Sequence, residues 1–130
     1  MLSIYRQFAA GPGAPAKFLT IYIEEAHAKD EWYFHESSVT TEFKTEIAVH
    51  KTLSERIAAA STFREKTQVK ELEMVCDSMR GDMVTRYGAW PERLYIIVDG
   101  VVVYKGGMGP FDYRLYEVRE WLEEKFPGRK

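Results

Sequence analysis

The chain has 130 residues, of which 45% are hydrophobic and 14% aromatic, so it suits a single domain with an apolar core. Its 18 basic and 20 acidic residues give a net charge of −2, which argues against a strong electrostatic nucleic-acid binder. One cysteine excludes an intramolecular disulfide framework, an internal dithiol pair and a zinc site of several thiolates. No apolar run approaches the roughly 18–20 residues that span a bilayer, and no signal-peptide pattern is present. We therefore expect a soluble domain as the chain is written.

The first third of the chain predicts a helix, a strand and an irregular insertion. Apolar residues at spacings of three and four indicate a weak helix over residues 2–10. The run Phe18–Ile23 is short and nearly all apolar, which is typical of a strand covered on both faces in a parallel sheet. The stretch from about 24 to 48 is polar, aromatic and irregular, and it is too long for an ordinary connection. We interpret it as an insertion.

The middle of the chain predicts a helix, a strand and a shorter helix. Thr52 and Glu55 have the spacing of a capping box, which predicts a helix over about 53–66. Its apolar stripe consists of Leu53, Ile57, Ala60 and Phe63. A strand is expected at 72–76 and a short helix at about 79–87, with Gly88 as its C-terminal stop.

The last third predicts a hairpin and a closing helix. Residues 93–98 and 101–105 are rich in β-formers and flank Asp99-Gly100, the strongest short hairpin signal. A helix is expected over about 113–125, and residues 127–130 are expected to fray. A parallel strand–helix part followed by an antiparallel hairpin and a helix is the second half of a thioredoxin-like layout. In that layout Pro91, just before the hairpin, is a candidate cis-proline.

Several sequence blocks resemble the iodothyronine deiodinases. The most specific are YIEEAH at residues 22–27 and PERLYII at residues 91–97. The others are Asp30–Trp32, His50–Arg56, Asp77–Met79, Tyr87–Ala89, Gly106–Pro110 and Glu117–Glu123. The resemblance covers about residues 18–126. It implies a thioredoxin-like three-layer α/β fold for residues 1–130 and reductive removal of iodide from thyroxine-type iodothyronines, as part of thyroid hormone metabolism.

The same resemblance implies a nucleophile that does not occur in this sequence. Deiodinases attack iodine with a selenocysteine that lies between the first core strand and the first helix, and external thiols then reduce the resulting selenenyl iodide. That strand would lie centrally, between the strands at 18–23 and 93–98. We therefore expect the fold to be incomplete at its N-terminus and the chain to be inactive as written. Our hypothesis is that an in-frame UGA was read as a stop and the frame restarted at Met1, which the upstream nucleotide sequence would test.

Two residues correspond, by resemblance, to a proton-delivery network. These catalytic candidates are Tyr22 and His50. An imidazole with an ordinary pKa near 6.5 suits proton transfer at neutral pH. The residues themselves leave other readings open, because Tyr22 could pack in the core and His50 could be a capping or solvated residue before the helix.

Three residues correspond to a clamp for the amino-acid end of the substrate. His27 and Arg93 are the substrate-binding candidates, and Glu25 orients them. Arginine offers a carboxylate a planar bidentate fork. The alternative for His27 is an exposed loop histidine, and for Arg93 it is an ion pair with Glu92 or Glu25.

The remaining chemistry-bearing residues are assigned no role. His35 and Glu24 are interpreted as solvated, and Cys76 as a buried small hydrophobe. A hydrophobic surface that binds the substrate rings is a further reading for the tryptophans, with core packing preferred for the last: Trp32, Trp90 and Trp121. The three histidines lack metal-ligand spacing, so no metal and no bound cofactor are expected.

Three functions remain open at this stage. The first is a deiodinase catalytic domain that uses an external thiol reductant. The second is a non-catalytic thioredoxin-like binding module, and the third is a peroxidase-like redox domain. The resemblance also implies a membrane anchor upstream of such a domain and a homodimer, but it does not decide between outer-ring and inner-ring deiodination.

Overall fold

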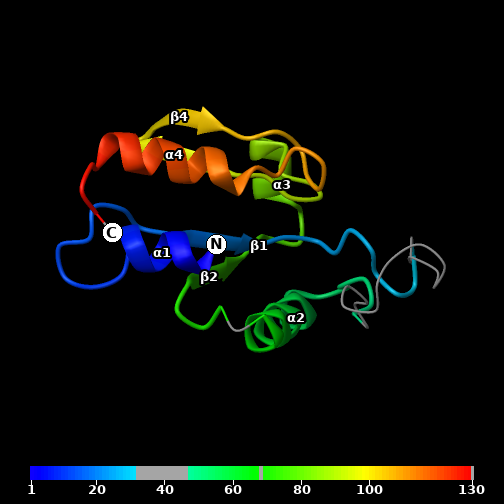
Figure 1. The fold of residues 1–130 in the computed structure, drawn as a ribbon. Coiled ribbons are helices and arrows are strands. Elements are labelled where there is room, and N and C mark those ends of the chain that lie inside the picture. The colour runs from blue at the N-terminus through cyan, green and yellow to red at the C-terminus, as the bar shows by residue number, and fades with distance from the viewer. Residues whose placement is uncertain (32–46, 68, 130) are drawn as a thin grey trace.

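The computed structural model describes residues 1–31, 47–67 and 69–129. Within them the chain forms four helices and four short strands (Figure 1). Their order is α1 (Leu2–Phe8), β1 (Leu19–Tyr22), α2 (Leu53–Lys66), β2 (Glu73–Cys76), α3 (Asp82–Tyr87), β3 (Tyr95–Val98), β4 (Val101–Lys105) and α4 (Leu115–Lys125). The predicted order of elements is confirmed, and the fold is mixed α/β. Trp32, His35 and most of the expected insertion lie outside the described residues.

The strands form two separate sheets. β1 and β2 pair in parallel, with Leu19 opposite Glu73 and Tyr22 opposite Cys76. β3 and β4 form an antiparallel hairpin. Asp99 and Gly100 at its turn have φ values of 50° and 80°, the paired positive angles that an Asp-Gly turn supplies. No ladder joins β1 to β3 in the described part of the chain.

The apolar core lies where the first and last helices meet. Ile4 and Phe8 of α1 pack against Val118 and Leu122 of α4. Ile96 and Tyr104 of the hairpin pack against the same cluster, so α4 covers one face of β3 and β4 (Figure 1). Trp121 packs there too, as predicted, whereas Trp90 is partly exposed. This cluster connects residues near the two ends of the chain.

Two burial predictions are wrong. β1 is not covered on both faces, because Leu19 is 56% exposed and the other three residues of the strand are half-buried. The predicted stripe of α2 is also wrong for most of its residues, since Leu53 and Ile57 are about half exposed and Phe63 is 39% exposed. The face that α2 buries carries Arg56 and Ala59 together with Ala60, which belongs to the predicted stripe.

The turn chemistry around the helices follows the sequence. Thr52 Oγ1 accepts from the Glu55 amide and Glu55 accepts from the Thr52 amide, so the capping box is present. α3 begins later than expected because Gly81 before it is left-handed, with φ of 69°. The Trp90–Pro91 peptide is cis, as predicted.

The C-terminal segment contacts the N-terminal part of the chain. The Arg129 side chain donates to the Gly13 carbonyl, and the Arg129 carbonyl accepts from the Gln7 side chain.

Candidate functional site

The carboxyl end of β1 brings three of the predicted site residues together. Tyr22 ends the strand, and its hydroxyl donates to the Glu25 carboxylate. The Tyr22 ring lies 5.9 Å from the His50 ring and 5.8 Å from the Phe63 ring, measured between centroids. Tyr22 is therefore packed against other rings and hydrogen-bonded through its hydroxyl, and its role in proton delivery stays a prediction.

Two hydrogen bonds hold the segment after β1 against the segment before α2. The Lys29 amide donates to the Ile47 carbonyl at 2.9 Å. The Val49 amide donates to an Asp30 carboxylate oxygen at 2.7 Å, and this bond is the main cause of the lowered pKa of Asp30. His50 follows at once. These bonds keep the residues that flank the undescribed stretch next to one another.

His50 is a buried histidine whose pKa is lowered, which favours the neutral form of its ring. It is 7% exposed, so the reading as a solvated residue before the helix is wrong. Burial lowers its pKa, and the Arg56 cation lowers it further, while Glu55 acts in the opposite direction. Nδ1 of His50 accepts from Nε of Arg56 at 3.4 Å. No partner within the described residues reaches Nε2.

The clamp candidates lie on two different parts of the fold. Glu25 and His27 follow β1, both are half-buried, and the charge of His27 partly offsets the rise in the pKa of Glu25 that burial causes. Glu24 beside them is exposed, as predicted. Arg93 precedes β3, where its Nη1 donates to the Gly106 carbonyl at 3.2 Å. The alternative reading, an ion pair of Arg93 with Glu92 or Glu25, is not found between these described side chains. The buried Nε of Arg93 has no hydrogen-bond partner in the described part of the chain.

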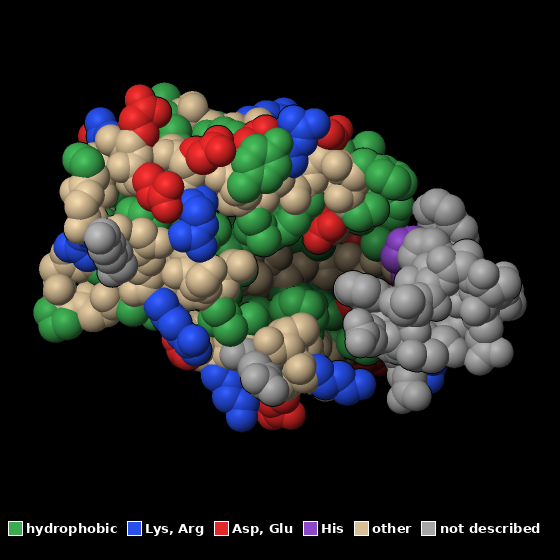
Figure 2. All heavy atoms as spheres, viewed as in Figure 1, with side chains coloured by type: hydrophobic (Ala, Val, Ile, Leu, Met, Phe, Trp, Pro, Cys, Tyr) green, Lys and Arg blue, Asp and Glu red, His purple; other side chains and the backbone are tan. Residues whose placement is uncertain are grey.

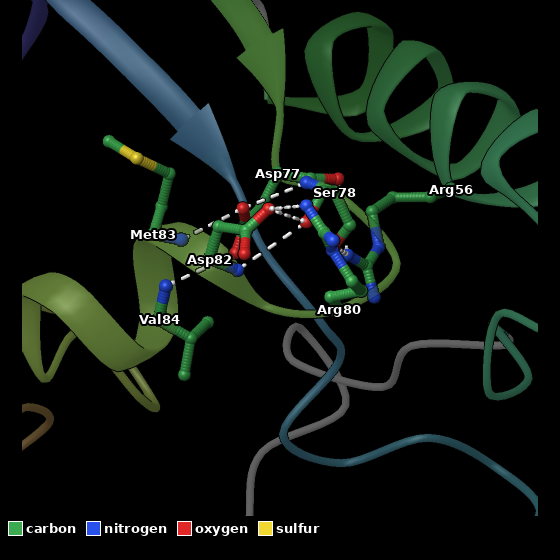
Figure 3. Close-up of polar contacts among 7 residues, drawn as sticks. All are labelled: Arg56, Asp77, Ser78, Arg80, Asp82, Met83 and Val84. Atoms are coloured by element: carbon green, nitrogen blue, oxygen red, sulfur yellow. Dashed lines mark hydrogen bonds and ion pairs between the residues drawn. The ribbon is translucent and has the colours of Figure 1, made fainter.

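Sequence reasoning missed two buried charged residues beside this site, Arg56 and Asp77 (Figure 3). Nη1 of Arg56 donates to the Asp77 carbonyl at 3.2 Å and to the Ser78 carbonyl at 2.6 Å. The Asp77 carboxylate accepts the amides of Ser78, Met83 and Val84 at 2.8–3.1 Å. The spacing gives a partial signal, because Arg56 lies three and four residues before Ala59 and Ala60, the other buried residues of α2.

Cys76 does not have the properties of a nucleophile. It is half-buried rather than fully buried, so that prediction is correct only in part. Burial raises the pKa of its thiol, which disfavours the reactive thiolate. Cys76 also lines a groove of about 340 Å³ between α2 and β2, and none of the five predicted site residues lines this groove.

Three further observations concern metal binding, membrane insertion and exposed hydrophobic side chains. Within the described ranges no cluster of three metal-ligating side chains occurs. No helix there has the length and apolarity to cross a membrane. Figure 2 shows hydrophobic side chains exposed on one face between α4 and α2.

Comparison with known proteins assigns the chain to a family. Residues 2–126 match the profile of iodothyronine deiodinase. Thyroxine 5-deiodinase of Bos taurus is 43% identical over 106 residues, which are 82% of this chain and 33% of the relative. Thyroxine 5-deiodinase of Aquarana catesbeiana is 38% identical over 123 residues, which are 95% of this chain and 43% of the relative. The human protein of that name is 41% identical over 106 residues, 82% of this chain and 32% of its own length. The chain thus spans about a third of the length of most of these relatives, and it belongs to the iodothyronine deiodinase family, an oxidoreductase family.

Proposed function

We propose that this chain binds iodothyronines and delivers a proton in their reductive deiodination, on a thioredoxin-like fold. The observation that carries the proposal is the group of Tyr22, Glu25 and His50 at the carboxyl end of a parallel strand. Ligand sites of open α/β sheets occur at this end of the strands. Thyroxine is the first substrate to test, because the relatives are thyroxine 5-deiodinases.

The reaction needs three contributions. The carbon–iodine bond breaks as iodine passes to a chalcogen nucleophile, the ring carbon takes a proton, and two thiols then reduce the chalcogen and release iodide. A buried histidine whose pKa is lowered is neutral at pH 7. In that form its single N–H can give its proton to the ring carbon, and the imidazolate left behind, beside the Arg56 cation, then takes up a proton from solvent. Tyr22 and the Glu25 carboxylate, whose pKa burial raises, form the hydrogen-bonded wall beside it.

Arg93 and His27 are proposed to hold the amino-acid end of the substrate. Arginine carries five N–H donors in a planar fork, and only Nη1 of Arg93 has a protein acceptor in the described part of the chain. Its buried Nε is unpaired there, and an incoming carboxylate would supply the acceptor.

The nucleophile is proposed to be a selenol or thiol other than Cys76. The raised pKa of Cys76 and its place beside the α2–β2 groove argue against it. The same observation favours one alternative, a non-catalytic binding module of the same fold. A binding module takes up thyroxine without releasing iodide.

The proposal is tested by measuring thyroxine binding to the chain, with quenching of tryptophan fluorescence as the readout. Arg93→Ala and His27→Ala remove charge-assisted hydrogen bonds worth about 1.5–3 kcal/mol each, so each should weaken binding roughly 10- to 150-fold. Glu24→Ala is the matched control, since Glu24 is exposed at the same strand end. Glu24→Ala should leave the thermal melt unchanged. Arg93→Ala also removes the hydrogen bond to the Gly106 carbonyl, worth about 0.5–1.5 kcal/mol, so its melting temperature should fall by a few degrees while the protein stays folded.

Two results would refute the proposal. One is the absence of saturable binding by the wild-type chain. The other is equal binding by the Arg93, His27 and Glu24 variants. Iodide release with dithiothreitol and a small-molecule selenol then separates the enzyme from the binding module, because only the enzyme accelerates release above the rate without protein.

A further inference from the structure

Arg56 is a buried cation without a carboxylate partner in the described part of the chain. It is 4% exposed, and no ion pair found there includes it. The nearest buried carboxylate, that of Asp77, is occupied by three backbone amides. Burying a guanidinium is costly unless hydrogen bonds satisfy it. Its recorded acceptors are two carbonyl oxygens and one ring nitrogen, Nδ1 of His50.

The two carbonyl bonds fix the plane of the guanidinium. Nη1 donates to the carbonyls of Asp77 and Ser78, which follow β2 (Figure 3). Because the guanidinium is planar and its N–H bonds diverge at fixed angles, anchoring Nη1 also sets the direction of the Nε–H bond. That bond points at Nδ1 of His50, 3.4 Å away. Arg56 therefore reaches His50 as a donor with a fixed orientation.

A donor at this position determines which ring nitrogen of His50 carries the proton. Arginine has no acceptor, so Nδ1 must present its lone pair to Arg56. In the neutral imidazole the proton then resides on Nε2. Nε2 is buried and meets no acceptor among the described residues. The lowered pKa of His50 is consistent with a neutral ring beside a cation.

We propose that Arg56 is a positioning residue that holds neutral His50 in its Nε2–H tautomer, so that Nε2 is the atom that presents the proton. This inference rests on the proposed function for the use of that proton, and on geometry alone for the tautomer. The simpler alternative is that Arg56 only ties α2 to the segment after β2. Loss of such a tie would lower stability without changing the tautomer.

The test is nitrogen-15 NMR of the full chain labelled at histidine, which separates protonated from lone-pair-bearing ring nitrogens. It is recorded above the titration range of histidine without substrate, with His50→Gln to assign the signals. The wild-type chain should show His50 as a single Nε2–H tautomer. Arg56→Met keeps the length of the side chain and removes the donor, so His50 should become a mixture of tautomers and its titration midpoint should rise. Arg64→Met, on an exposed position of the same helix, should change neither.

Each outcome decides the inference. An Nδ1–H form of His50 in the wild-type chain overturns it, and this measurement does not depend on the folding of any variant. A folded Arg56→Met protein that retains a pure Nε2–H tautomer also overturns it. Arg56→Lys, which can donate one bond to Nδ1, should restore part of the Nε2–H population. Thyroxine binding and iodide release are measured separately, so failure of the proposed function would leave the tautomer result readable.

Discussion

The Asp77 carboxylate offers the sharpest test of how this site is supported. It is 2% exposed and accepts the amides of Ser78, Met83 and Val84 (Figure 3). Asp77→Ala leaves three donors without their acceptor, and each unsatisfied donor costs about 1–3 kcal/mol when water cannot replace the partner. Met83 and Val84 are half-buried, so partial hydration places the total near the lower part of that sum. We expect a loss of about 3–5 kcal/mol in the free energy of unfolding.

The assay is urea denaturation followed by circular dichroism, with a thermal melt as a second measure. For a chain of this size the expected loss corresponds to a fall in Tm of about 10–25 °C. Asp77→Asn keeps one acceptor oxygen and should cost about 1–3 kcal/mol, so a folded variant remains even if the alanine variant does not fold. Asp82→Asn is the control, because Asp82 is exposed and its carboxylate bonds, within the described residues, to Ser78 and Arg80 alone. If Asp77→Ala cost no more than Asp82→Asn, the carboxylate would not hold α3 and the reasoning would fail.

Three further predictions concern other parts of the chain. Phe8→Ala, in the α1–α4 core, should cost about 3–5 kcal/mol, whereas Phe111→Ala, at 94% exposure, should stay within about 0.5 kcal/mol in the same urea assay. His50 has a folded-state pKa below its unfolded value of about 6.5, so the unfolded state takes up the proton first as pH falls. Stability should be fully present above about pH 6.5 and decline below it, and His50→Gln should remove that decline; an unchanged acid limb would contradict this. Burial and the hydrogen bond to Glu117 raise the pKa of Tyr104 to about 12, so its stabilising effect should be present below about pH 10 and be lost between about pH 10 and 12. Ultraviolet titration should show a tyrosine with a midpoint near 12 that Tyr104→Phe removes, while Tyr113, whose pKa burial also raises, remains in that variant. A midpoint near 10 for Tyr104 would contradict the assignment.

Local sequence signals predicted the elements well because they act over a few residues. The capping box at Thr52 and the turn at Asp99-Gly100 depend on neighbours three residues apart or less, and both are present. The strand and helix order follows from such signals in turn. Burial of α2 could not be predicted in this way, because the face that a helix buries depends on which strand lies against it. Here Arg56, Ala59 and Ala60 are buried, whereas Leu53 and Ile57 line the groove between α2 and β2 and stay about half exposed.

The candidate site was predictable in its residues but only partly in its geometry. The sequence indicates Tyr22 and His50, and the structure packs their rings together. The hydrogen bond from Arg56 to His50 could not be predicted from the sequence. That contact requires carbonyl groups after β2 to anchor a side chain of α2. The pKa of a histidine depends on such neighbours, which are distant in the chain. The roles of all five candidates stay predictions: Tyr22, Glu25, His27, His50 and Arg93.

The separation of the two sheets bears on how a ligand could act on this protein. His27 follows β1 and Arg93 precedes β3, and no ladder joins these strands in the described ranges. The two strands are instead connected by the packing of α1 and Phe18 against α4 and the hairpin, and by hydrogen bonds from Arg119 to Gln7 and Ser3. A ligand held at both residues would add a direct link between the two sheets, which side-chain contacts join in the described part of the chain. Saturation with such a ligand should slow amide hydrogen exchange in β1 and β3 together, so that two local openings merge into one cooperative event.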